Sequence, residues 1–130
     1  MLSRTMKPGF QPTMLLDRSA ALERIGGDED LLKEIAGLFL AEYPVLIEGI
    51  RVALERGDAE ALERSAHNLK GSVANFEARP AVEAALRLEA MGRNRNLDRA
   101  WSALTELEEV LRVLHPELIN LSKVEPPAAL

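Results

Sequence analysis

The chain has 130 residues, the length of one domain, and 47% of them are hydrophobic, which is enough for a single core. Cysteine is absent, which excludes a disulfide framework, thiolate chemistry and a cysteine-based zinc site. The net charge of −5 with no long basic block argues against nucleic acid as a partner, and no apolar run approaches the roughly 18 residues of a membrane span.

The first part of the chain is expected to be a linker followed by a short helix. Residues 1–14 contain two prolines and a glycine without hydrophobic periodicity, so we predict a flexible N-terminal segment. A short helix is predicted over residues 15–25. Gly26 and Gly27 should end it, because glycine adopts the left-handed conformation after a helix with little strain.

A long second helix is predicted over residues 29–56. Asp28 is suited to cap its first turn, and Pro44 should cause a kink or local break around residues 41–44 because proline lacks a backbone N–H. The residues predicted to form its apolar face are Leu31, Leu32, Ile35, Leu38, Phe39, Leu46, Ile47, Ile50 and Leu54.

The next boundary is the tripeptide Arg56-Gly57-Asp58. Gly57 is expected to end the second helix and Asp58 to cap the third. The same three residues spell an integrin-recognition sequence, but the two capping roles already explain the glycine and the aspartate. We therefore interpret the tripeptide as a helix boundary.

The third helix, ending near residue 78, carries the most informative pattern. At about 100° per residue, one narrow apolar stripe forms, and His67 points roughly 140° away from its centre. The members of the stripe are Leu62, Ala66, Leu69, Val73 and Phe76. The sequence therefore predicts that the stripe is buried and that His67 faces solvent.

Two further helices are predicted, at residues 81–91 and 97–114, with a polar loop between them. Pro80 suits a first helical turn. Pro116 should limit the last helix, and a further helical turn up to residue 121 is an open alternative. Trp101 is expected to anchor the last helix in the core. His115 is expected to be structural, in the last turn of that helix, and residues 122–130 should form a flexible tail.

This pattern predicts an all-α fold. Short connections between helices favour antiparallel neighbours, so we expect an up-down antiparallel four-helix bundle with a short extra N-terminal helix, over residues 15–121.

The surface around His67 is unusual for a solvated helix. Gly71 and Ala74 lie on the exposed side, where charged residues are common, and a mid-helix glycine costs about 1 kcal/mol relative to alanine. Lys70 and Arg64 place positive charge on either side of His67. Arg64 has an alternative, an ion pair with Glu60 on its own helix. An exposed imidazole, a nearby cation and a bare surface suit the reception of a phosphoryl group.

The segment His67 to Ser72, together with Asn75, Phe76 and Ala78, resembles the signature of histidine-containing phosphotransfer (HPt) domains. The resemblance extends over about residues 15–121 and implies the same bundle fold. One residue departs from the family pattern: Glu77 stands where the family usually has glycine. This change affects the packing of the helix end and the approach of a partner at that edge.

The resemblance implies that His67 is a phosphoacceptor that receives its phosphoryl group from the phospho-aspartate of a response-regulator receiver domain and passes it to another. Lys70 would stabilise the phosphate, and Gly71, Arg64, Asn68 and Ala74 would form the docking surface. No metal or cofactor of its own is expected, because Mg²⁺ belongs to the receiver. The isolated domain is expected to be a cytoplasmic monomer and a carrier, not an enzyme, since it lacks an ATP-binding motif.

Two alternatives remain open. The chain could be a degenerate adaptor that binds receivers without transfer, with Glu77 marking the loss. It could also be the phosphoacceptor domain of a hybrid sensor kinase or chemotaxis-type kinase, which would require an ATP-binding segment outside this sequence.

Overall fold

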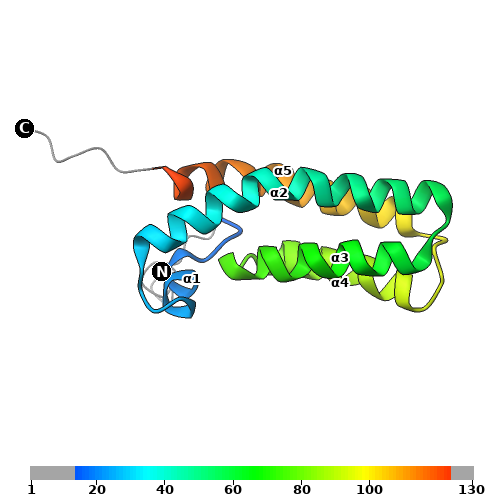
Figure 1. Cartoon of the computed structure of the whole chain (residues 1–130), viewed down its shortest axis with the longest axis horizontal. Coiled ribbons are helices and arrows are strands. Elements are labelled where there is room, and N and C mark those ends of the chain that lie inside the picture. Colours follow the sequence, from blue (N-terminus) through cyan, green and yellow to red (C-terminus); the bar gives the residue numbers. More distant parts are fainter. Residues whose placement is uncertain (1–13, 124–130) are drawn as a thin grey trace, which may run out of the picture.

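The computed structural model describes residues 14–123, and the regular elements of this part of the chain are all helices (Figure 1). The predicted N-terminal segment and tail lie almost wholly outside the described residues. The elements are α1 (Arg18–Arg24), α2 (Glu29–Arg56), α3 (Ala59–Val73), the 3-10 turn η2 (Ala74–Phe76), α4 (Arg79–Arg93) and α5 (Ala100–Ser122).

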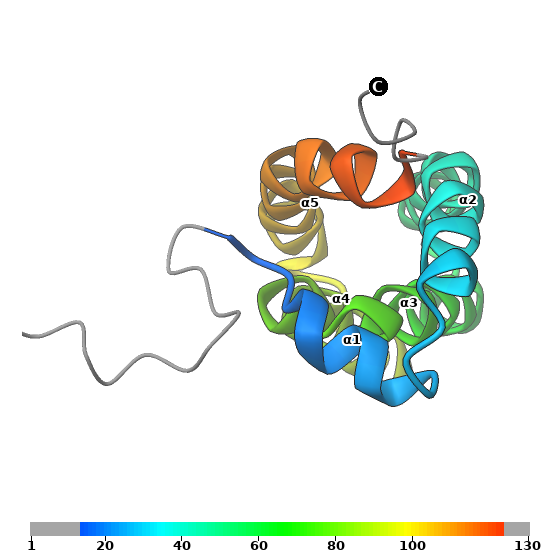
Figure 2. The same ribbon diagram turned by 90° about the vertical axis from the view of Figure 1, so that its left-hand side faces the viewer.

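Helices α2 to α5 form a bundle in which each helix packs against the next one in the chain and α5 returns to α2 (Figure 2). Successive helices run in opposite directions (Figure 1). The short helix α1 lies at one end of the bundle, in contact with η2 and α2. The predicted all-α bundle with an extra N-terminal helix is confirmed.

Aspartate side chains set the starts of three helices. Asp17, Asp28 and Asp58 precede α1, α2 and α3, and each carboxylate accepts the backbone N–H of the residue three positions further on. Gly57 ends α2 with a φ of 64°, in the left-handed region. The caps at Asp28, Gly57 and Asp58 are as predicted, whereas α1 begins later than expected because Asp17 caps it.

The prediction for one proline is met, and that for the other is not. Helix α2 continues through Pro44 without a local break, but it is bent along its length (Figure 1), which agrees with the kink predicted there. Helix α5 also continues through Pro116, so the predicted end near residue 114 is wrong. Leu118 and Leu121 beyond Pro116 are buried, and this burial favours the continued helix over the loss of one hydrogen bond.

The core includes the stripe predicted for the third helix: all five members from Leu62 to Phe76 are fully buried. Helix α3 itself ends at Val73, earlier than predicted, and Phe76 lies in η2. Several predicted core positions are exposed instead. Trp101 is 48% exposed and Leu38 is 64% exposed, and Leu31 is also at the surface. The bundle has a narrower apolar seam than the pattern suggested, and alanines fill much of the space between the helices.

Candidate functional site

His67 lies in the middle of α3 on the side that adjoins α4. Its side chain is 62% exposed, whereas its neighbours Ala66 and Leu69 are fully buried. The predicted orientation of His67 is therefore confirmed, and it follows from the 3.6-residue period of the helix.

A buried carboxylate from α4 meets the imidazole. The side chain of Glu89 is only 4% exposed, and its Oε2 lies 3.0 Å from Nδ1 of His67. Its other oxygen, Oε1, lies 2.7 Å from Nζ of Lys70 as an ion pair. Glu89 thus joins the two residues that the sequence predicted as the chemical centre of the site.

Two more charged side chains complete the cluster. Nη2 of Arg93 lies 2.7 Å from Oε2 of Glu89, one turn away on α4. Nε of the same guanidinium donates to Oε2 of Glu63 on α3, at 3.1 Å. The phosphoacceptor candidate therefore belongs to a network of alternating charges that bridges α3 and α4.

Glu89 is ionised in this environment. Burial alone raises the pKa of its carboxyl group, but the nearby Lys70 and His67 outweigh that effect and hold the pKa below its ordinary value. An ionised carboxylate can only accept hydrogen bonds, so Nδ1 of His67 carries the proton and donates it. The other ring nitrogen, Nε2, then presents its lone pair away from Glu89.

Sequence reasoning missed Glu89 and Arg93. Glu89 lies on the apolar side of α4, directly after the buried Leu88 and three residues before the buried Gly92. A carboxylate in such a position needs cationic partners, and this signal was available in the sequence. Arg93, four residues further on, is a partner on the same helix. The partners His67 and Lys70 were not identifiable for Glu89, because they come from another helix.

The predicted docking residues lie beside the network on α3. Arg64, Asn68 and Gly71 are exposed, and Ala74 is half-buried. A Cβ at Gly71 would meet no atom within 4 Å, so no neighbouring group requires glycine there. Among residues 14–123, Arg64 is in no ion pair, which leaves the proposed pairing with Glu60 unformed.

Glu77, at the position where the resemblance implies glycine, adopts a backbone conformation that favours glycine. Its φ is 51°, in the left-handed region that disfavours residues with a Cβ. Its carboxylate lies 2.6 Å from Nη1 of Arg24 on α1. The negative charge at this edge is thus paired with a cation and does not lie beside His67.

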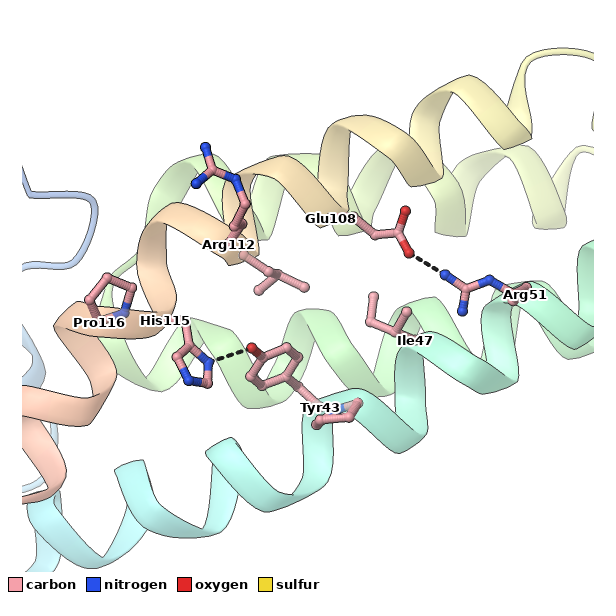
Figure 3. A pocket seen from close by; sticks show the side chains of 9 residues that line it. Tyr43, Ile47, Arg51, Glu108, Arg112, His115 and Pro116 are labelled. Atoms are coloured by element: carbon pink, nitrogen blue, oxygen red, sulfur yellow. Dashed lines mark hydrogen bonds and ion pairs between the residues drawn. The ribbon is translucent and has the colours of Figure 1, made fainter.

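The second histidine belongs to a different part of the molecule. His115 lines a groove between α2 and α5 (Figure 3). The His67 network is on α3 and α4 instead. Burial raises the pKa of Tyr43, so its hydroxyl keeps its proton, and it forms a hydrogen bond of 2.6 Å with Nδ1 of His115. Helix α5 continues past Pro116 to Ser122, so the prediction that His115 lies in the last turn is wrong.

The comparisons with known proteins agree with this geometry. Residues 34–116, which include the whole network, match the family model of the Hpt domain. The fold is similar to the crystal structure of histidine-containing phosphotransfer protein B (HptB) from Pseudomonas aeruginosa PAO1, with a TM-score of 0.71 and 23% identity, over 88% of this chain and 95% of that one. No curated protein matches the chain.

Within residues 14–123, no helix is long and apolar enough to cross a membrane. Because the matched range covers most of its length, the chain belongs to the Hpt domain family, whose role is histidine phosphotransfer in phosphorelays.

Proposed function

We propose that His67 accepts a phosphoryl group from the phospho-aspartate of a receiver domain and passes it to another receiver. The observation that carries this proposal is the exposed imidazole of His67, with Nδ1 bound to the buried carboxylate of Glu89. This contact leaves Nε2 as the nucleophilic nitrogen on the solvent side.

In the transfer step, the lone pair of Nε2 forms a bond to phosphorus. The bond between phosphorus and the aspartate oxygen breaks, and that oxygen keeps the electron pair as a carboxylate. Nδ1 still carries its proton, so the ring of His67 becomes positively charged. The carboxylate of Glu89 lies 3.0 Å from that nitrogen and stabilises the charge.

Lys70 and His67 share Glu89 as a partner, so the ammonium group is held at the same buried carboxylate as the ring. This ammonium group has three donors, so it can bind a phosphoryl oxygen and still contact Glu89. Positioning and charge neutralisation are the main contributions of a protein to phosphoryl transfer. The remaining positive charge is expected from Mg²⁺ on the receiver, and the chain itself then acts as a cytoplasmic carrier without an ATP site.

The receiver would dock on the outer face of α3, over Asn68 and Gly71. Both residues are exposed, and the space over Gly71 is open. Neither position carries an acidic side chain, so an acidic receiver pocket can approach His67 there without repulsion from a Glu or Asp side chain.

Labelling with a panel of phosphorylated receivers tests the proposal. The protein should gain an acid-labile, alkali-stable phosphoryl group, and His67→Gln should lose it while keeping the fold. His115→Gln is the matched control and should still be labelled. An acid-labile label on His67→Gln would place the phosphoacceptor elsewhere. Binding of phospho-receivers by the unaltered protein without any label would instead support the adaptor alternative.

A further inference from the structure

One oxygen of Glu89 serves two donors. Oε2 lies 3.0 Å from Nδ1 of His67 and 2.7 Å from Nη2 of Arg93. Because a protonated imidazole and a guanidinium are both cations, the two groups compete for the same negative charge. The strength of the contact between Glu89 and His67 therefore depends on Arg93.

Arg93 is fixed in this position from two sides. Its Nε donates to Glu63 on α3 and its Nη2 donates to Glu89 on its own helix. Among residues 14–123, the charged side chains that pair within this cluster come from α3 and α4: Glu63 and Lys70 from α3, and Glu89 and Arg93 from α4. Arg64, three residues before His67 on α3, adds a positive charge on the same helix. Among the described residues, no ionisable side chain of α1, α2 or α5 forms an ion pair with them.

We propose that Arg93 is a positioning residue that, through Glu89, keeps His67 in the neutral form with the proton on Nδ1. The proposal rests on the phosphoacceptor role of His67 and adds a control of its protonation. Only the neutral imidazole has a lone pair on Nε2, so only this form can attack phosphorus.

The physical basis is the balance of charge around the ring. Glu89 by itself favours the imidazolium, because an ionised carboxylate stabilises a neighbouring cation. Arg93 opposes this in two ways: it takes up part of the charge on Oε2, and its own positive charge disfavours a second cation nearby. Loss of Arg93 therefore leaves His67 protonated up to a higher pH.

The test follows the imidazole signals of His67 by NMR during a pH titration of the unphosphorylated protein. Arg93→Ala and Arg93→Gln should move the titration midpoint of His67 upward by roughly half a pH unit relative to the parent protein, since solvent at the exposed ring weakens the effect of a neighbouring charge. Arg93→Lys keeps the positive charge and should restore the midpoint of the parent protein.

Arg87→Ala is the matched control. Arg87 is on the same helix, its side chain is 53% exposed like that of Arg93, and it pairs with Glu106 at 3.7 Å, away from Glu89. This variant removes the same net charge and should leave the midpoint unchanged. The His67 midpoint tests the inference without any transfer assay, so it can fail while phosphoryl transfer is present.

A second readout is the transfer rate as a function of pH. The rising limb of the profile should move upward in Arg93→Ala and Arg93→Gln, and rates at high pH should approach those of the parent protein. An unchanged midpoint in both variants, or an equal change in Arg87→Ala, would overturn the inference. If Arg93→Ala unfolds, Arg93→Gln decides, because it keeps most of the side-chain packing.

Discussion

Gly92 of α4 lies directly against the backbone of Glu63 on α3. A Cβ at position 92 would come within 2.7 Å of the amide nitrogen of Glu63 and of the carbonyl oxygen of Ala59. The two helices therefore approach each other at a distance that only glycine permits. This approach lies one turn from Glu89 and sets its position beside His67.

Gly92→Ala should therefore destabilise the protein by about 1 to 3 kcal/mol, the range for overpacked sites, and should slow phosphoryl transfer because α4 must move away from α3. Thermal unfolding and transfer rate are the measurements. Gly37→Ala is the control, since a Cβ at Gly37 meets nothing within 4 Å and alanine is the better helix former. Equal stability of both variants would show that the close approach is unimportant.

Substitutions at Gly71 separate a docking role from a packing role. Gly71→Glu and Gly71→Ala should keep or raise the melting temperature, because the added atoms meet open space and both residues favour a helix more than glycine does. Transfer should fall strongly in Gly71→Glu and slightly in Gly71→Ala, since the carboxylate adds bulk and negative charge where a phosphoryl group approaches. Transfer by Gly71→Glu at the rate of the parent protein would rule out docking over this face.

Glu89→Gln removes the negative charge that holds the network together. The pKa of Glu89 lies below its ordinary value of 4.5, so its ionised form stabilises the fold above that pH, and this contribution is lost as the pH falls through the lowered pKa. Glu89→Gln should therefore lower stability at pH 7, and the difference from the parent protein should shrink at more acidic pH. Denaturant unfolding at several pH values measures it.

The same variant should slow transfer even where it is fully folded, because a neutral amide stabilises the positively charged phospho-imidazole less than a carboxylate does. Rates at pH 7 and at a temperature well below unfolding test this point. A difference in stability that stays constant from pH 7 to pH 3, with an unchanged transfer rate, would argue against both roles of Glu89.

Glu77→Gly should stabilise the isolated domain by up to about 1 kcal/mol. Glycine relieves the φ of 51° at this position, whereas the lost ion pair with Arg24 is partly exposed and contributes little. Transfer should rise modestly at most, because the charge of Glu77 is paired with Arg24 and not directed at His67. Arg24→Ala isolates the contribution of the ion pair, and a marked loss of stability in Glu77→Gly would show that the pair outweighs the backbone strain.

The sequence by itself determined the local features of this protein. Four features depend on neighbours within one or two turns: the aspartate caps, the end of α2 at Gly57, the buried stripe of the third helix and the exposure of His67. Helix periodicity and capping preferences predict such local relationships. The residues from His67 to Ser72 indicated the family because they are also a local pattern, confined to less than two turns of one helix.

The tertiary structure alone decided which groups surround the imidazole. Glu89 reaches His67, and Arg93 reaches Glu63, only because α3 and α4 pack in one register, at the close contact that Gly92 allows. The continuation of α5 through Pro116 and the exposure of Trp101 are likewise set by which faces find a partner helix. Burial and ion pairing between helices depend on distances across the bundle, and the local periodicity of a single helix does not contain those distances.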